Sequence, residues 1–180
     1  MRIILGAGET TYEGWVATQE SELNLLKEED WETHFEEESI DALLAEHVWE
    51  HMTYEEGVIA AKLCYKYLKK GGYIRCAVPD KNFNDDWYQN MVQVGGPGPK
   101  DHPAASHKVV YDYKEFVDVF ERAGFKVNLL EYCDENHQFH HKYWDEVKGK
   151  INRSFRFDTR NHGTNLKMIS IIIDAKKEFK

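Results

Sequence analysis

The sequence has few of the features that mark secreted, disulfide-rich or membrane-spanning proteins. Its 180 residues include three cysteines, Cys64, Cys76 and Cys133, and no two of them form a CxxC pair. This spacing argues against a disulfide framework and a thiolate zinc site, and we predict buried, reduced thiols. No apolar run approaches the ~20 residues that a membrane span needs. The opening apolar run is also too short for a signal peptide, so we expect a cytoplasmic protein.

Basic side chains are scarce in the first third of the chain. Residues 1–56 hold Arg2 and Lys27 against sixteen Asp and Glu, whereas residues 142–180 hold ten Lys and Arg against five acids. An acidic surface repels a phosphate backbone, which argues against a nucleic-acid partner along that part of the protein. The lack of a long apolar run likewise argues against a membrane partner, and neither observation excludes a homodimer.

Proline is also scarce, and three of the four prolines lie in residues 80–111, beside Gly95, Gly96 and Gly98. We interpret this segment as a long loop over the sheet edge. A second segment, residues 135–165, is rich in His, aromatic residues and Arg. Long insertions in compact domains are more often functional than accidental. We expect the second insertion to serve substrate or a dimer interface, with shielding of a sheet edge as the alternative.

Apolar runs bounded by turn residues alternate with helical periodicity, which predicts βα units in one α/β domain spanning residues 1–180. The predicted helices are Tyr54–Lys69, with Thr53 and Glu56 as a capping box, Tyr113–Ala123, and a short one within residues 27–38. The predicted strands are Arg2–Leu5, Gly14–Thr18, Leu23–Leu26, Ile40–Ala45, Gly72–Val78, Lys126–Tyr132 and Lys167–Ala175.

Three segments of the sequence indicate a ligand-binding site. The first strand runs directly into Gly6-Ala7-Gly8-Glu9-Thr10, where glycines permit a tight turn and close approach of a ligand. The second block, residues 39–52, is an apolar strand that ends in Glu46-His47-Val48-Trp49-Glu50-His51. The third, residues 67–80, reads YLKKGGYIRCAVPD: helix, double-glycine turn, strand and Pro-Asp.

In this order, the three blocks resemble the class I S-adenosylmethionine-dependent methyltransferases, and most closely a small, poorly characterised predicted group of them. The likeness covers residues 1–80 well and residues 115–132 more loosely. It implies a Rossmann-like, mostly parallel sheet of about seven strands in the order 3-2-1-4-5-7-6. Only six residues separate Gly8 from Trp15, so we expect the first helix of the fold to be reduced or absent.

The resemblance also implies transfer of a methyl group from the cofactor S-adenosylmethionine to a small-molecule or peptide acceptor, and a set of residues around that cofactor. Its methionine part would lie against Gly6, Ala7, Gly8 and Glu9. Thr18 and Gln19 would lie at the ribose, with Glu20 as the nearest acid, and Leu25, Leu26 and Trp31 would surround adenine. Glu46 and His47 would face the methyl group, and the candidate catalytic residues are Glu46, His47 and His51.

Two other functions remain open. His47-Val48-Trp49-Glu50-His51 is a literal HxxEH, the inverted zinc-peptidase motif, which requires a helix that presents both histidines on one face. Here the motif straddles the end of a strand, so we predict no metal site. In the family that the chain resembles, an acid at the end of the second strand holds the ribose hydroxyls, and here Gln19 stands at that place. The displaced acid favours a third hypothesis, a non-catalytic S-adenosylmethionine-binding module that acts with a partner.

Overall fold

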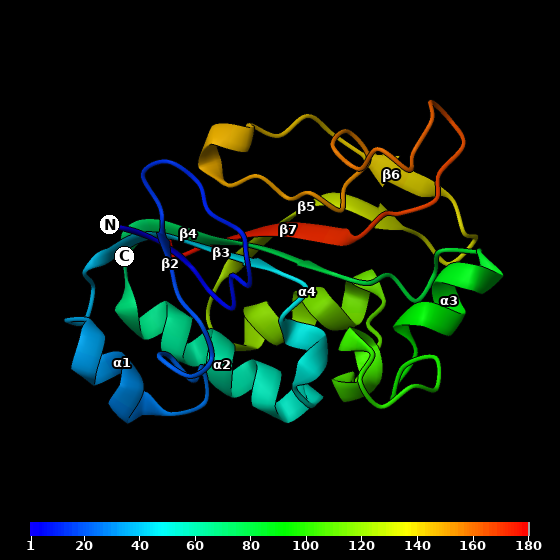
Figure 1. The fold of residues 1–180 in the computed structure, drawn as a ribbon. Helices are drawn as coiled ribbons and strands as arrows, with labels where there is room; N and C mark the ends of the chain where they lie inside the picture. Colours follow the sequence, from blue (N-terminus) through cyan, green and yellow to red (C-terminus); the bar gives the residue numbers. More distant parts are fainter. Residues whose placement is uncertain (180) are drawn as a thin grey trace.

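The computed structural model describes residues 1–179 and consists of one mixed sheet between a helical layer and an irregular layer (Figure 1). The strands are β1 (Arg2–Ile4), β2 (Val16–Ala17), β3 (Ile40–Glu46), β4 (Leu68–Val78), β5 (Lys126–Cys133), β6 (Phe139–His141) and β7 (Ile171–Lys176). The α-helices are α1 (Glu28–His34), α2 (Tyr54–Tyr67), α3 (Asp86–Val92) and α4 (Tyr113–Arg122). Three 3₁₀ turns complete them: η1 (Trp49–His51), η2 (Pro103–Ser106) and η3 (Glu146–Lys148).

The strand order is β2-β1-β3-β4-β7-β5-β6, which corrects the order and the mostly parallel character expected from the sequence. The pairings β1–β2, β1–β3 and β3–β4 are parallel, and β4–β7, β5–β7 and β5–β6 are antiparallel. The expected total of seven strands is right for the described residues, because one predicted strand is missing and an unpredicted strand, β6, extends the opposite edge.

The missing strand is Leu23–Leu26, which forms turns instead. Asn24 is the cause. Its side-chain oxygen accepts a hydrogen bond from the Leu26 backbone N–H at 2.9 Å, and its own N–H donates to Asp30 at 2.8 Å. Such local side-chain bonds offer the backbone an alternative to a strand ladder, and they turn the chain into α1.

The two longer predicted helices form, the first with its expected cap and the second with a capping box that was not predicted. Thr53 and Glu56 close a capping box on α2, and Asp112 and Glu115 close another on α4. Helix α2 ends at Tyr67, earlier than predicted, because Leu68 already pairs with Ile40 of β3. Between β1 and β2 the described chain contains turns and no helix, as expected.

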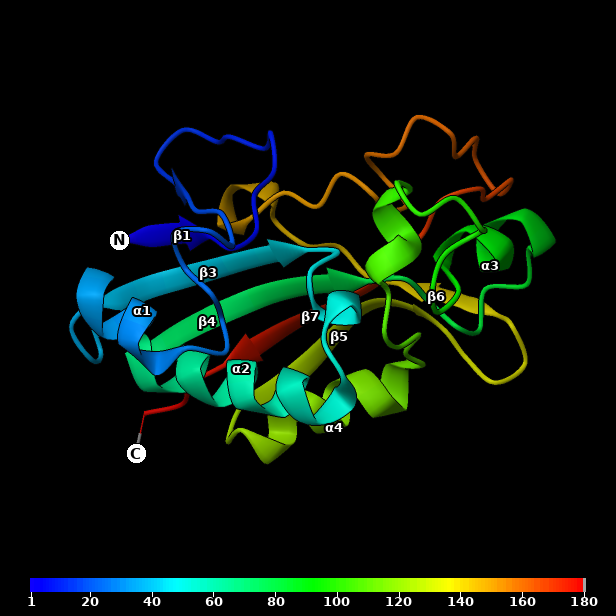
Figure 2. The same ribbon diagram turned by 60° about the horizontal axis from the view of Figure 1, so that its bottom comes forward.

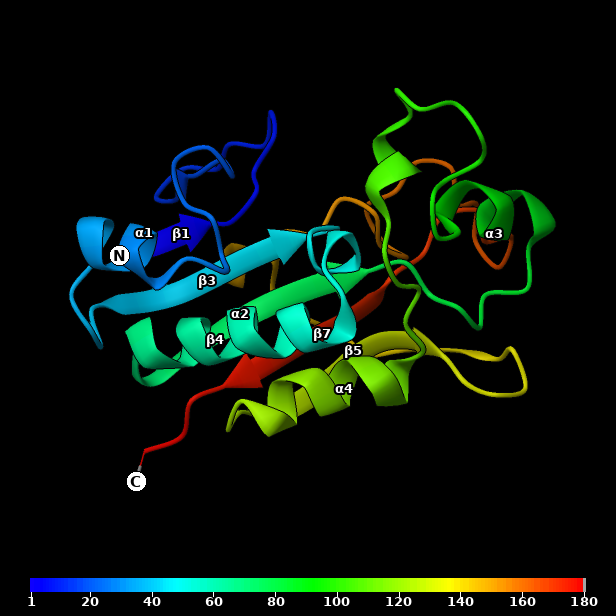
Figure 3. The same cartoon turned by 90° about the horizontal axis from the view of Figure 1, so that it is seen from below.

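Side chains alternate between the two faces of the sheet and build two cores. Leu43 packs toward α1, α2 and α4, which cover one face (Figures 1 and 3). Its neighbour Leu44 belongs to a second core on the opposite face. There the sheet is covered by residues 5–20 and 142–165, whose inward side chains include Tyr12, Trp15, Trp144, Ile151 and Phe157. The second insertion therefore covers a face of the sheet, and only its hairpin strand β6 extends an edge.

A buried arginine holds that insertion in place. Arg75 of β4 is 1% exposed and makes a bidentate pair with Asp174 of β7, at 2.7 and 2.8 Å. Its remaining terminal nitrogen donates to the carbonyl oxygens of Asp145 and Gly149, and the guanidinium lies 4.9 Å from the ring of Trp144. One side chain thus joins two strands to η3 and the segment around it.

The first insertion lies at the carboxyl ends of β3 and β4 (Figure 2). It contains helix α3, which the sequence interpretation treated as loop, and η2. Tyr88 of α3 is buried, and its hydroxyl accepts from the Asp80 N–H and donates to the Ile169 carbonyl, both at 2.8 Å. None of the helices in the described part of the chain combines the length and apolar character that crossing a membrane requires.

We expect Arg75→Leu to lower the free energy of unfolding by about 3 kcal/mol or more, because it leaves Asp174 and two carbonyl oxygens without their partner. Urea denaturation measures this loss. The control is Lys69→Leu, which breaks the exposed Lys69–Asp41 pair and should cost under about 1 kcal/mol. Equal losses in the two variants would contradict the central role of Arg75.

Candidate functional site

Two adjoining cavities open at the carboxyl ends of the parallel strands. The larger has a volume of about 590 Å³ and lies between the turn after β1, α3, η2 and the second insertion. The smaller, of about 530 Å³, lies between residues 20–26, the end of β3 and residues 52–56. Gly6, His47 and His51 line both cavities. This edge of an open α/β sheet is where such folds bind ligands.

The glycine turn after β1 lies where the two cavities meet. Gly6 and Gly8 have φ of +54° and +56°, a left-handed conformation that favours glycine. A Cβ on Gly6 would lie 2.9 Å from Val48, so this glycine is required for packing. A Cβ on Gly8 would meet no atom within 4 Å, so Gly8 borders open space that a ligand can occupy. Ala7 and Glu9 line the larger cavity beside it.

Of the three residues after β2, Thr18 and Gln19 hydrogen-bond to the backbone nearby, and Glu20 is exposed at a cavity. The Thr18 hydroxyl donates to the Ile4 carbonyl at 2.7 Å, and Thr18 lines neither cavity. The Gln19 amide accepts from the Gly8 N–H at 3.1 Å and donates to the Gly8 carbonyl at 2.8 Å. Both side chains thus hold the turn together, and the exposed carboxylate that lines the smaller cavity is Glu20.

Of the three residues expected around adenine, two lie at the smaller cavity and the third lies in the core. Leu25 and Leu26 line the smaller cavity. Trp31 lines neither cavity, because it is fully buried under the sheet and stacks on Tyr67 at 5.3 Å. Its indole N–H donates to the Leu25 carbonyl at 3.4 Å, so it supports the cavity wall from behind.

Glu46 and His47, at the end of β3, have different environments. Glu46 pairs with Arg153 at 2.9 Å and accepts the Asn152 N–H, so the second insertion reaches the cavity through it. His47 has φ of +55°, an uncommon conformation for a non-glycine residue. Its Nε2 lies 2.7 Å from the Ser170 hydroxyl. Burial, followed by the charge of Arg153, lowers the pKa of His47 well below 6.5 and keeps the imidazole neutral.

His51 and Glu50 lie side by side in η1. Burial lowers the pKa of His51 to about 4, with smaller contributions from His107 and Arg153, so this imidazole is also neutral at pH 7. Burial raises the pKa of Glu50 to about 8. His51 and His47 are not one turn apart on a helix, because η1 begins only at Trp49 and His47 ends the strand connection. The helical zinc-peptidase arrangement of HxxEH is therefore absent from the described chain.

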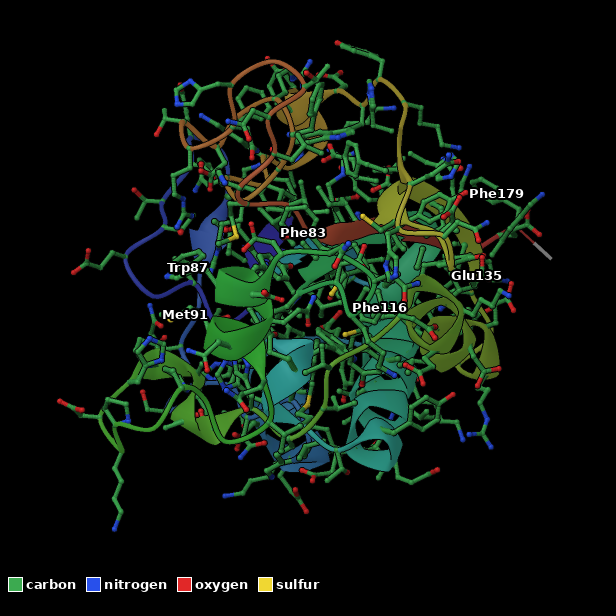
Figure 4. The ribbon with its side chains drawn as sticks, turned by 90° about the vertical axis from the view of Figure 1, so that its right-hand side faces the viewer. Phe83, Trp87, Met91, Phe116, Glu135 and Phe179 are labelled. Carbon is green, nitrogen blue, oxygen red and sulfur yellow. The ribbon has the colours of Figure 1, made fainter. Side chains whose placement is uncertain are left out.

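Both insertions supply cavity residues that the sequence could not assign. Trp87 and Met91 project from the same side of α3, away from the core residue Phe116 (Figure 4), and both line the larger cavity. His102 and His107 line it near η2, and Arg153 lines it from the second insertion. Of the other aromatic residues in the two insertions, Tyr88, Tyr111 and Trp144 are buried, and Tyr143 is exposed beside Arg156. The sequence alone could not predict that these residues line one cavity, because they are far apart in the chain and meet only when it folds.

The chain is similar in sequence and fold to known methyltransferases. A family model described as "Methyltransferase domain" matches residues 13–76. No curated protein sequence matches this one. A solved S-adenosylmethionine-dependent methyltransferase from Archaeoglobus fulgidus is 14% identical, with 98% of this chain and 86% of that chain covered and a TM-score of 0.56. One from Thermotoga maritima is 15% identical, with 99% and 73% covered and a TM-score of 0.51.

A third similar structure is the chain bound by the Trm112 methyltransferase activator in a Haloferax volcanii complex. It is 10% identical, with 99% of this chain and 82% of that chain covered and a TM-score of 0.54. At these identities the three structures show the fold. Together with the family match, they confirm the resemblance to class I S-adenosylmethionine-dependent methyltransferases, whose cofactor is S-adenosylmethionine.

We expect Gly8→Val to abolish binding of S-adenosylhomocysteine, because a branched side chain would fill the open space beside the turn. Calorimetric titration measures the affinity. Gly163→Val is a matched control: Gly163 has φ of +58° and also borders open space, but it lies outside both cavities. Binding by a folded Gly8→Val protein with the parent affinity would refute the placement of the ligand.

Glu20→Gln should weaken S-adenosylhomocysteine about tenfold, the effect of losing a hydrogen bond from a ribose hydroxyl to a charged acceptor. Glu13→Gln, an exposed acid outside both cavities, is the control and should leave the dissociation constant unchanged. Binding by Glu20→Gln with the parent affinity would show that the assignment of the carboxylate is wrong.

Proposed function

We propose that this methyltransferase-type protein transfers the methyl group of S-adenosylmethionine to a small-molecule or peptide acceptor that carries an anionic group. The observation that carries the proposal is the pair of cavities that meet at the glycine turn and His47. One cavity has apolar and acidic walls suited to a nucleoside, and the other has cationic walls suited to an anion. Chain segments from residues 4–10 to Met168 line the larger cavity, which also supports a single methyltransferase-like domain.

The residues of the smaller cavity fit the nucleoside part of the cofactor. Leu25 and Leu26 offer aliphatic edges to a flat ring, and Glu20 offers a carboxylate to hydroxyl groups. At the junction, the open side of Gly8 would accept the methionine part. When bound, the cofactor supplies an electrophilic methyl group on a sulfonium. Direct displacement needs little from the protein beyond alignment of the two reactants and removal of a proton.

His47 and His51 are the proposed contacts with the reacting atoms, because they line both cavities. The Ser170 hydroxyl donates to the Arg153 carbonyl at 2.8 Å and therefore accepts the Nε2–H of His47. This bond holds the His47 ring at the junction. We assign Glu46 a positioning role, since both of its carboxylate oxygens are bound to the second insertion.

The anionic preference comes from Arg153, Arg160 and Lys150, which line the larger cavity. Arg160 is already held by a bidentate pair with Asp158. Arg153 uses only its Nε for Glu46, and within the described residues its two terminal nitrogens have no hydrogen-bond partner. A guanidinium with two free terminal NH₂ groups in a cavity is suited to a carboxylate or phosphate.

We expect Arg153→Gln to raise the KM of an anionic acceptor by about tenfold or more, because a charge-assisted hydrogen bond is lost. Transfer of labelled methyl to hydroxybenzoate, to its uncharged amide and to acidic peptides would identify a usable acceptor. Arg122→Gln, on the exposed side of α4, is the control.

The dissociation constant of S-adenosylhomocysteine should remain unchanged in Arg153→Gln. A preference for the uncharged amide would contradict the anionic acceptor. Tight cofactor binding without transfer to any acceptor, alone or with an added partner, would favour the non-catalytic binding module.

A further inference from the structure

Three potential metal ligands converge beside the larger cavity. Glu50, His51 and His107 each offer one ligand atom, and these atoms all lie within 4.8 Å of one another. Glu50 and His51 belong to η1, whereas His107 follows η2 in the first insertion. The Lys108 N–H donates to the Glu50 carbonyl at 2.8 Å, and this backbone bond draws the two segments together.

The hydrogen bonds of both histidines leave one ring nitrogen free for a cation. The Nδ1 of His107 lies 2.8 Å from the Val92 carbonyl, which can only accept, so Nδ1 carries the proton and Nε2 is free. The Nδ1 of His51 lies 2.7 Å from the Ser106 hydroxyl, which can accept its proton in the same way. Histidines that bind metals typically donate their other N–H to a carbonyl or hydroxyl that orients the ring.

Glu50 supplies an independent indication of a ligand. Its side chain is 1% exposed, and neither carboxylate oxygen has a hydrogen-bond partner among the described residues. The nearest ring nitrogen of His47 is 3.6 Å away, too far for a hydrogen bond. Buried carboxylates without partners are costly, and in proteins they are normally paired or bound to a metal.

We propose that Glu50, His51 and His107 bind a divalent transition-metal cation of the Zn²⁺ class at the wall of the larger cavity. Two imidazoles and one carboxylate form the donor set of mononuclear zinc sites that keep a position open for water or substrate. Imidazole favours transition metals over Mg²⁺ and Ca²⁺. Since His51 and His107 line the larger cavity, a bound cation would lie within reach of oxygen groups on its occupant.

This site differs from the HxxEH motif and departs from the sequence-based prediction of no metal. HxxEH would use His47 and His51 as ligands and Glu50 as a base. Here Glu50 is itself a ligand, and His107 takes the place of His47, whose Nε2 is bound to Ser170. The metal site does not depend on methyl transfer, because its ligands are defined by the apoprotein geometry.

The test uses the full chain without an affinity tag, stripped with a chelator and titrated with ZnCl₂ in a calorimeter. We expect one Zn²⁺ per chain and a rise in melting temperature on binding. Substitution with Co²⁺ should produce the visible absorption of a four- or five-coordinate site. Glu50→Gln and His107→Asn should each weaken Zn²⁺ by more than about 100-fold, because second-shell changes alone cost 10- to 100-fold.

Glu55→Gln and His162→Asn, exposed residues of the same types, are the controls and should bind as the parent does. Circular dichroism establishes that each variant is folded. Absence of stoichiometric Zn²⁺ in the parent, or parent-like binding by both ligand variants, would overturn the proposal. Titration of the stripped parent with S-adenosylhomocysteine tests the proposed function separately, since cofactor binding with no Zn²⁺ binding would refute the metal site alone.

Discussion

The buried guanidinium of Arg75 is the interaction on which the site side of the structure depends. Both faces of this sheet must be covered by other parts of the chain, and the helices α1, α2 and α4 cover one of them. On the other face, a long segment with little regular structure must be held against β4 and β7. Arg75 provides this through two carbonyl oxygens and the ring of Trp144, while Asp174 balances its charge. Lys150 and Arg153, which line the larger cavity, follow Gly149 closely in the chain. The contact of Arg75 with the Gly149 carbonyl therefore also positions the cationic wall of this cavity.

The acidic and basic segments of the chain meet in the folded protein. The acidic first third contributes Glu46 at the end of β3, and the basic last segment contributes Arg153, and the two pair at the cavity wall. The pairing uses one nitrogen of Arg153, which lines the larger cavity, and leaves the other two nitrogens without a hydrogen-bond partner among the described residues. An arginine anchored in this way is preorganised, so less rotamer freedom is lost when it binds an anion.

The end of β3 concentrates unusual features in six residues. His47 adopts a left-handed conformation, Glu50 is buried without a partner, and His51 lines both cavities. The strained backbone of His47 and the buried, unpartnered carboxylate of Glu50 are both unfavourable for stability. Such features persist where the surrounding structure imposes them and are concentrated at functional sites. This segment therefore links the proposed cofactor position, the acceptor cavity and the proposed metal site.

Local patterns in the sequence determined much of the fold: the glycine turn, the buried strand before Glu46, and the capping boxes of α2 and α4 follow from neighbours in the chain. The same patterns misjudged Leu23–Leu26, where the side chain of Asn24 outweighs the apolar run, and they did not show that Trp31 packs in the core. They could not show that Gln19 binds Gly8, that Glu46 pairs with Arg153, or that His107 approaches Glu50. Only the tertiary structure brings these residues within range. The pairing of β1 with β2 brings Gln19 to Gly8, the Arg75 anchor brings Arg153 to Glu46, and the Lys108–Glu50 backbone bond brings His107 to Glu50.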